Sequence, residues 1–480
     1  MKSGATHGSA SLMSVTTTLS RFCATLSTDA LPIDVVPRVR ALVLDLMGCT
    51  IRANADAPAA ATLKAGAIAL GMQGGGAQVF GDHRKWSPVG ATFLNAALGH
   101  ALDFDDTHAP STLHPGAPVI PAAFAAAAMA GASGADLIAG IVAGYETTCR
   151  IGLALPAGDH YARGFHPTAT CGVFGAAAAA GRILRLDADQ IESALGIALS
   201  QSAGSLQFLA DGAWTKPFQV GWASQSGLSA ALMAREGYRG PRAALEGRHG
   251  FLQGYAPSPQ PERVCQDLGL VFETMATGIK PYPSCRYGHA GIDATLALRT
   301  QSGFDTSKID RVTYGLSRAG LLLVGAPLEA KQNPTNLVGA QFSAPFVLSM
   351  ALISGEMTWD SYKRLDDPAV RALMAKVDCV HDPDIEAEFP VNMAGKITIE
   401  ADGERHTKTV IIPLGEPANF LSDDAIFTKF EGLARPVIGE QLHGIAEAVS
   451  QLDKLPNVQA WLEKSDGLRP QNEAPQRISS

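Results

Sequence analysis

The distribution of hydrophobic residues changes character near residue 278. Before that point, apolar residues occur in long alanine-rich runs. Alanine has the highest helix propensity of all residues, and small side chains allow neighbouring helices to pack closely. Almost no alternating pattern typical of strands is present in this part of the chain. The predicted helices lie within residues 93–104, 122–155, 172–205 and 221–238.

After residue 278, β-branched residues alternate with polar ones. This period of two is typical of half-buried strands. Strands are predicted within residues 310–318, 391–401 and 406–415, and helices within 290–303, 342–355 and 368–377. Beyond Pro413 the pattern is helical again, within residues 422–435 and 439–455.

These patterns predict a mainly α protein. A large all-helical domain would comprise residues 13–277 and 414–465, and a smaller α+β domain, residues 278–413, would interrupt it. A cleft between two such domains is a usual place for a ligand. The small, polar segments 1–12 and 466–480 are predicted to be disordered.

Composition narrows the functional classes. The 480 residues carry a formal charge of −8, which argues against a nucleic-acid partner, because such proteins present basic patches. The most apolar segment, PVIPAAFAAAAMAGASGA, is mostly alanine and contains two prolines, so we expect a buried helix and no membrane span. No basic segment followed by an apolar run opens the chain. Seven cysteines without a CxxC pair favour reduced thiols in the cytoplasm.

Four clusters carry candidate chemistry, and each places a histidine or lysine beside a proline. The first is ALDFDDTHAPSTLHPG, with Asp103, Asp105, Asp106, Thr107, His108 and His114. On a helix, Asp103, Asp106 and Thr107 would share one face. The segment is interpreted either as a solvated acidic helix end or as a divalent metal site, since carboxylates and imidazoles bind such ions.

The second cluster, YARGFHPTATCG, contains Arg163 and His166. His166 precedes Pro167, which disfavours helical backbone at His166, so a helix is predicted to begin just after it. The positive end of a helix disfavours a charged imidazole and suits a neutral base. A purely structural histidine is the alternative.

The third cluster is DGAWTKPFQVGWASQSG, in which Lys216 precedes Pro217. We predict a rigid, non-helical link between helices here. The aromatic neighbours Trp214 and Phe218 would desolvate the lysine and lower its pKa towards acid–base work. The alternative is a surface lysine with its stem along apolar side chains.

The fourth cluster, KPYPSCRYGHAGID, contains Lys280, Arg286 and His289. It falls on the predicted domain boundary, so His289 would face the cleft and the two cations would bind an anion. A positive pocket in an acidic protein suits a small polycarboxylate. Acid–base residues without a cofactor loop indicate proton abstraction next to a carboxylate. The glycine-rich GMQGGGAQVFG is predicted to be a loop and not a nucleotide site, because GxGxxG spacing is missing.

Six segments, in order and spacing, resemble the MmgE/PrpD family over roughly residues 15 to 460. They are DFDDTH…HPG, GYETTCRIGLA, GFHPTATCGVFGAAAAAGRIL, TKPFQVGWASQSG, KPYPSCRYGHAGIDA and PTNLVGAQFSAPF. The family includes 2-methylcitrate dehydratases, cis-aconitate decarboxylases and iminodisuccinate epimerases. The resemblance implies a large all-helical domain, a small α+β lid domain and a homodimer with its site between the domains.

The resemblance to the decarboxylase branch also implies site residues. Catalytic roles would fall to Asp103, His114, His166, Lys216 and His289. Thr107 would contact the substrate, and Lys280, Arg286 and Arg163 are candidate carboxylate contacts. This chain carries one residue more than the decarboxylase pattern between Thr107 and His114.

The sequence thus predicts a lyase or isomerase that acts on a small di- or tricarboxylate, with neither a metal nor another cofactor. A base among His166, Lys216 and His289 would move a proton at the carbon beside a carboxylate, and cations would stabilise the enolate-like charge. Dehydration, decarboxylation and epimerisation all remain open, as do the roles of Tyr145 and Gln341.

Two alternatives belong to other functional classes. One is a carboxylate-binding protein without activity. The other is a class II terpene cyclase that uses DFDD as its acid motif, but 6% aromatic residues is few for a pocket that must stabilise carbocations.

Overall fold

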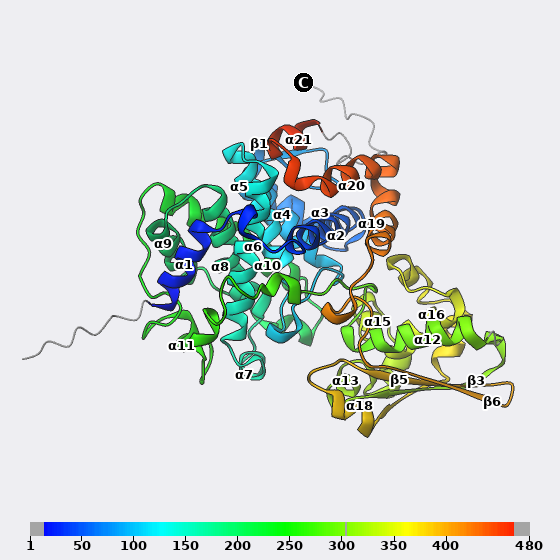
Figure 1. Cartoon of the computed structure of the whole chain (residues 1–480). Helices are drawn as coiled ribbons and strands as arrows, with labels where there is room; N and C mark the ends of the chain where they lie inside the picture. Colours follow the sequence, from blue (N-terminus) through cyan, green and yellow to red (C-terminus); the bar gives the residue numbers. More distant parts are fainter. Residues whose placement is uncertain (1–13, 303–304, 465–480) are drawn as a thin grey trace, which may run out of the picture.

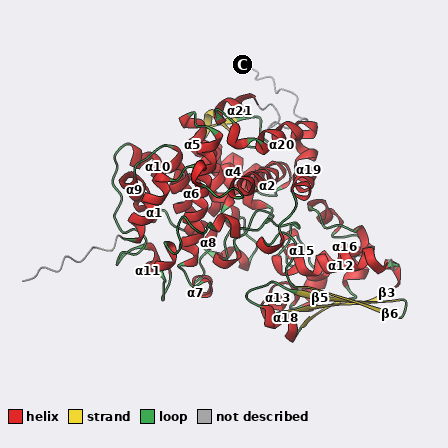
Figure 2. Ribbon diagram, in the orientation of Figure 1, coloured by secondary structure: helices red, strands yellow, loops and turns green. Residues whose placement is uncertain are grey.

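The computed structural model describes residues 14–302 and 305–464. It confirms the predicted fold class, a large helical domain joined to a smaller domain of helices and a mixed sheet (Figures 1 and 2). The predicted disorder of residues 1–12 and 466–480 lies outside the described residues. Among the described helices, none combines the length and apolar character that crossing a bilayer requires.

The large domain contains fourteen of the described α-helices, from both ends of the chain. The first eleven are α1 (Val15–Thr25), α2 (Val35–Asp56), α3 (Ala60–Ala69), α4 (Pro88–Ala101), α5 (Gly116–Ala130), α6 (Gly134–Leu153), α7 (Ala157–Ala162), α8 (Pro167–Ile183), α9 (Ala188–Leu199), α10 (Thr215–Arg235) and α11 (Phe251–Tyr255). The last three are α19 (Asp423–Ile438), α20 (Leu442–Ser450) and α21 (Val458–Lys464).

Small residues let α5, α6, α8 and α10 pack closely at the centre of this domain. A methyl group on Gly175 of α8 would overlap the Thr148 hydroxyl of α6 and lie 2.7 Å from the Gly144 carbonyl oxygen. The alanine-rich composition is therefore a packing requirement as well as a helix signal.

The C-terminal helices pack on the N-terminal part of the chain. Helix α19 lies along α2, as Figure 1 shows in orange and blue. Phe430 and Ile438 of α19 belong to the same hydrophobic core as Val39 and Val43 of α2. This packing is compatible with the predicted return to the helical domain after residue 413, and the exact domain boundaries stay a prediction.

The small domain is built around a four-stranded mixed sheet, in which the strand order is β4-β3-β5-β6. Its strands are β3 (Ile309–Leu316), β4 (Val377–His381), β5 (Gly395–Ala401) and β6 (Glu404–Val410). Its helices are α12 (His289–Ser302), α13 (Arg318–Gly320), α14 (Leu328–Gln332), α15 (Leu337–Gln341), α16 (Ala344–Ser354), α17 (Pro368–Met374) and α18 (Pro383–Glu388). Figure 2 shows α12 and α16 beside the sheet, where α12 packs on β5 and β6.

A third apolar cluster joins the two domains. Trp359 of the small domain packs with Leu98, Leu102 and Phe104, which lie in and just after α4. The Arg52 guanidinium of α2 binds Asp360, next to that tryptophan. The end of α4 therefore packs against a part of the small domain that is also bound to α2.

Three strands were not predicted from the sequence. The glycine-rich segment predicted to be a loop contains β1 (Gln73–Gln78), which pairs with β2 (Lys85–Trp86) in a small antiparallel ribbon. Three consecutive glycines hide the usual strand signal there. Strand β4 was missed because it is short, and it gains its stability by parallel pairing with β3.

The close contact between α6 and α8 generates a prediction. Gly175→Ala should lower the melting temperature, because overpacking a well-filled core typically costs about 1–3 kcal/mol. The matched control is Gly66→Ala in α3, where an added methyl group meets nothing within 4 Å. That variant should melt at or slightly above the wild-type temperature, since alanine is the better helix former. Equal melting temperatures for the two variants in thermal denaturation would contradict the packing described here.

Candidate active site

The first predicted cluster forms an irregular loop and not the helix face that we expected. Helix α4 ends at Ala101, and Asp103 adopts a φ of 53°, in the left-handed region that ends helices. Asp103, Asp105 and Asp106 are all at least 92% buried, so the solvated acidic helix end is wrong as well. Burial of three carboxylates requires compensating partners.

Groups from distant parts of the chain hold this loop in place. Gln341 Nε2 donates to the Leu102 carbonyl oxygen (2.9 Å), and Lys429 Nζ donates to that of Phe104 (2.7 Å). Thr107 exchanges two backbone hydrogen bonds with Gly278, at 2.9 and 2.7 Å. Gln341, whose role the sequence left open, therefore positions the backbone of the loop.

The Asp103 carboxylate lies between two lysines. Lys216 Nζ is 2.7 Å from Asp103 Oδ1, and Lys280 Nζ is 3.3 Å from the same oxygen. Lys280 also donates to the Asp103 carbonyl oxygen (2.7 Å). Burial acts to raise the pKa of Asp103, but the two lysines outweigh it and hold the pKa far below its ordinary value. The carboxylate is therefore ionised.

The two lysines differ in environment. Lys216 lies in the first turn of α10, and not in the non-helical link predicted from the sequence. Its side chain remains 24% exposed, whereas that of Lys280 is 4% exposed. Burial lowers the pKa of Lys280, and this makes its ammonium a better proton donor near neutral pH than that of an ordinary lysine.

Beside this ion pair, Asp105 connects two histidines. Asp105 Oδ2 is 2.8 Å from His100 Nδ1, and Asp105 Oδ1 is 3.4 Å from His114 Nδ1. Burial lowers the pKa of His114 to about 4, although Asp105 acts in the opposite direction. The three side chains also offer ligand atoms within 4.8 Å of one another, so they are the group that fits the predicted metal alternative best.

Two further histidines stand at the beginnings of helices. His166 is the N-cap residue of α8, as predicted, and its ring centroid is 5.7 Å from that of His100. His289 begins α12 and donates from Nε2 to the Ser284 carbonyl oxygen (3.2 Å), which leaves Nδ1 as the acceptor of the neutral ring. Burial, with nearby cations, holds the pKa of both histidines well below its ordinary value, so both are neutral.

The two remaining substrate-binding candidates, Arg286 and Arg163, lie in different parts of the structure. Arg286 is bonded to the Thr107 hydroxyl and to Glu416, so it lies next to the loop. Arg163 is exposed at the end of α7 with its guanidinium over the Phe165 ring, apart from the cluster described above.

The hydrogen-bond partners of Asp106 hold the loop in place. It accepts hydrogen bonds from the Tyr145 hydroxyl (2.7 Å) and the Gly116 amide (3.0 Å), which ties the loop to the first turn of α5. Burial and the charge of Asp105 raise the pKa of Asp106 to about 8. Tyr145 thus acts through Asp106 and has no contact of its own with the lysines.

Sequence reasoning missed His100, Lys429 and Glu416. His100 had a weak signal, as a polar residue in the last turn of an alanine-rich helix, three positions before Asp103. Lys429 and Glu416 had none, because Lys429 reaches the loop from 325 residues away and Glu416 binds Arg286, which is also distant in sequence.

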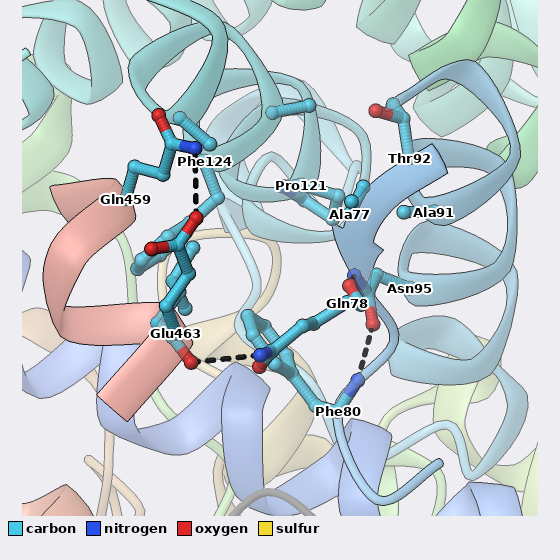
Figure 3. Close-up of a pocket in the computed structure, with 14 residues that line it drawn as sticks. Ala77, Gln78, Phe80, Ala91, Thr92, Asn95, Pro121, Phe124, Gln459 and Glu463 are labelled. Atoms are coloured by element: carbon cyan, nitrogen blue, oxygen red, sulfur yellow. Dashed lines mark hydrogen bonds between the residues drawn. The ribbon is translucent and has the colours of Figure 1, made fainter. Parts of the chain in front are cut away.

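A pocket elsewhere in the large domain contains none of these groups (Figure 3). It is lined by parts of β1, α4, α5 and α21, and Gln78 Nε2 crosses it to donate to the Leu462 carbonyl oxygen (2.7 Å). Its single charged lining residue is Glu463. Its lining gives it no acid–base pair for catalysis.

The MmgE/PrpD N-terminal domain matches residues 17–264, and the MmgE/PrpD C-terminal domain matches residues 282–454. The chain therefore belongs to the MmgE/PrpD family. This confirms the resemblance carried by the six segments.

Cis-aconitate decarboxylases and a decarboxylase-like protein are similar to most of this chain. A cis-aconitate decarboxylase-like protein of Aspergillus oryzae is 31% identical over 93% of this chain and 96% of its own length. A cis-aconitate decarboxylase of Aspergillus terreus is 31% identical over 94% and 95% of the two chains. The human cis-aconitate decarboxylase is 26% identical over 77% of each.

The ion pair of Asp103 generates a prediction about stability and pH. Asp103→Asn keeps a residue that tolerates a positive φ but leaves the buried Lys280 without its counter-charge, which typically costs about 3–5 kcal/mol. The pKa of Asp103 is depressed in the folded protein, so this stabilisation is present above the pKa of an unfolded aspartate, about 4, and is lost as pH falls below it.

Urea denaturation at pH 7 and below pH 4 measures this effect. The difference in unfolding free energy between wild type and Asp103→Asn should be large at pH 7 and should shrink on acidification. Asp366→Asn, whose side chain is 95% exposed, is the control and should match wild type throughout. A gap that does not change with pH would contradict the ion pair.

Proposed function

We propose that this protein is a lyase that acts on a small di- or tricarboxylate by moving a proton at a carbon beside a carboxylate. The observation that carries the proposal is the meeting of Lys216 and Lys280 with neutral His166 and His289 around one buried loop. Cations bind carboxylates, and neutral imidazoles accept protons. Both requirements of the reaction are thus supplied at the junction of the two domains.

The side chains divide the work as follows. Lys216 and Arg286 bind substrate carboxylates, and Lys216 is reachable because its side chain is partly exposed. His289 accepts a proton at Nδ1, or His166 at its unbonded Nδ1. Lys280, with its lowered pKa, donates a proton or stabilises the enolate-like charge. Asp103 holds both lysines in position.

Among the possible outcomes, we favour decarboxylation. A cis-aconitate decarboxylase is 31% identical to this chain over nearly its whole length. In this reaction the carboxylate leaves as CO₂, its bonding electrons pass to the neighbouring carbon, and that carbon takes a proton. The terpene-cyclase alternative loses its basis, because Asp103 and Asp105 are held ionised and the chain belongs to a family of carboxylate enzymes.

Proton NMR in D₂O tests the proposal with cis-aconitate, citrate, 2-methylcitrate and racemic iminodisuccinate. With cis-aconitate we expect a new product that carries one solvent deuterium per turnover. Lys216→Ala should reduce the rate at least about 100-fold, since it removes a charged contact to the reacting carboxylate. Lys363→Ala, which removes a lysine 72% exposed elsewhere in the small domain, should keep wild-type activity.

Each other outcome has a defined meaning. A product from citrate or 2-methylcitrate would indicate dehydration, and deuterium exchange without a new compound would indicate epimerisation. Stabilisation of the protein by one of these acids, with neither product nor exchange, would contradict the lyase and support the carboxylate-binding alternative.

We also propose that the protein is a cytoplasmic homodimer. Helix α10 presents Trp214, Phe218 and Trp222 at intervals of four residues, each at least 37% exposed. An aromatic face of this kind on a monomer is typical of a protein contact, and a second copy can bury the same face in an isologous interface.

Light scattering after size exclusion tests the dimer. Wild type should elute at twice the monomer mass, and Trp222→Glu should shift it towards the monomer. Leu270→Glu, at a residue 82% exposed on another part of the domain, should leave the mass unchanged. A monomeric wild type, or a dimeric Trp222→Glu protein, would exclude this interface.

A further inference from the structure

His100 and Asp105 form a buried pair that the proposed reaction does not use. His100 is 1% exposed and Asp105 is fully buried, so neither side chain is part of the protein surface. Asp105 is ionised, because the two neighbouring imidazoles outweigh the effect of burial and hold its pKa well below the ordinary value. Apolar packing would often stabilise the fold as well as such a buried charge does, so stability alone does not account for it.

The geometry connects this pair to a candidate catalytic side chain. The two oxygens of Asp105 point to different histidines, with Oδ2 2.8 Å from His100 Nδ1 and Oδ1 3.4 Å from His114 Nδ1. The rings of His100 and His114 meet edge to face, with centroids 4.8 Å apart. His114 is the outermost member, with 16% of its side chain exposed.

A carboxylate that accepts from Nδ1 determines the tautomer of a histidine. Because an ionised carboxylate can only accept, His100 carries its proton on Nδ1 when neutral. His114 Nδ1 and Asp105 Oδ1 make no hydrogen bond in this structure but face each other at 3.4 Å, so the carboxylate favours the same tautomer of His114, which leaves Nε2 as the basic nitrogen. The same carboxylate stabilises the imidazolium that forms when Nε2 takes a proton, as in other carboxylate–histidine pairs of enzymes. A ring held in this way does not have to reorient before it reacts.

We infer that His100 and Asp105 are positioning residues for His114: Asp105 fixes its tautomer and ring orientation, and His100 fixes Asp105. The inference rests on the proposed function and on a catalytic role of His114 in that reaction, which the resemblance to the decarboxylase branch implies. His114 exchanges the proton at Nε2, and the proton on Nδ1 stays between His114 and Asp105. No co-reactant is needed, because the proton that His114 accepts comes from the substrate or from water and returns there.

Other titratable groups near His114 must be considered in any pH-dependent measurement. These come from α4, the loop after it, the beginning of α8 and the segment before α12, and they are His100, Asp103, Asp105, His166 and Lys280. Of these, Asp105 is the group that favours the protonated form of His114 most strongly. Its removal should therefore shift the protonation of His114 to lower pH.

The first readout needs no turnover. Nitrogen-15 NMR of the histidine rings reports which nitrogen carries the proton, and the His114 signal is assigned with His114→Gln. In wild type we expect the Nδ1–H tautomer for His114. Asp105→Asn, which preserves shape but removes the charge, should give a mixture of tautomers. A His114 ring with its proton on Nε2 in the wild type would overturn the inference.

The second readout is kinetic and uses the substrate found by the deuterium experiment. Asp105→Asn should lower kcat at least about 10-fold, a part of the 10²- to 10⁴-fold typical of general acid–base catalysis, while KM changes less than about threefold. The pH limb that reports His114 should move to lower pH. A merely structural role would instead change KM and the melting temperature together and leave that limb in place.

His100 allows a matched pair of variants. His100→Gln keeps an N–H group that can donate to Asp105, so we expect a small loss and a preserved tautomer of His114. His100→Leu removes the donor and should resemble Asp105→Asn. If the two His100 variants behave alike, His100 does not act through Asp105.

Two controls separate this inference from its alternatives. A stoichiometric divalent metal in the purified protein, lost in Asp105→Asn, would overturn it, because the Nδ1 atoms would then be ligands and not donors. If no carboxylate is turned over, the proposed function fails, and the nitrogen-15 experiment still decides whether the His100–Asp105–His114 arrangement exists.

Discussion

The buried carboxylate of Asp103 between Lys216 and Lys280 is the interaction on which the rest of the site depends. Burying a charge without a partner strongly destabilises the folded protein, so the fold has to bring all three groups together. Asp103 belongs to the loop after α4, Lys216 to the beginning of α10, and Lys280 to the segment that leads into the small domain. One ion cluster thus joins the large domain to the segment that leads into the small domain.

The environment around that cluster gives chemically similar side chains different protonation states. Burial keeps His166 and His289 neutral, whereas the lysines keep Asp103 ionised. Asp105 and Asp106 are consecutive, yet two imidazoles lower the pKa of the first, while burial and the charge of the first raise that of the second to about 8. Groups that are identical in solution thereby become separate acids, bases and counter-ions.

Much of this was predictable. Alanine-rich runs indicated the helical domain, and alternating β-branched residues indicated β3, β5 and β6. His166 at a helix beginning followed from Pro167, because proline restricts the residue before it. Local signals failed where neighbours in space decide the structure. The segment 102–108 continues a helical pattern, but Gln341, Lys280 and Lys429 bind its carbonyl groups and hold it as a loop.

The sequence by itself determined the fold class, the family and the residue types available for chemistry, because these depend on local propensity and on motifs read along the chain. Only the tertiary structure decided which charges face one another. It placed Lys280 beside Asp103, separated from it by 177 positions, and Asp105 between His100 and His114. Electrostatic interactions and desolvation depend on distance in space and on burial, and neither is encoded in the order of residues within a segment.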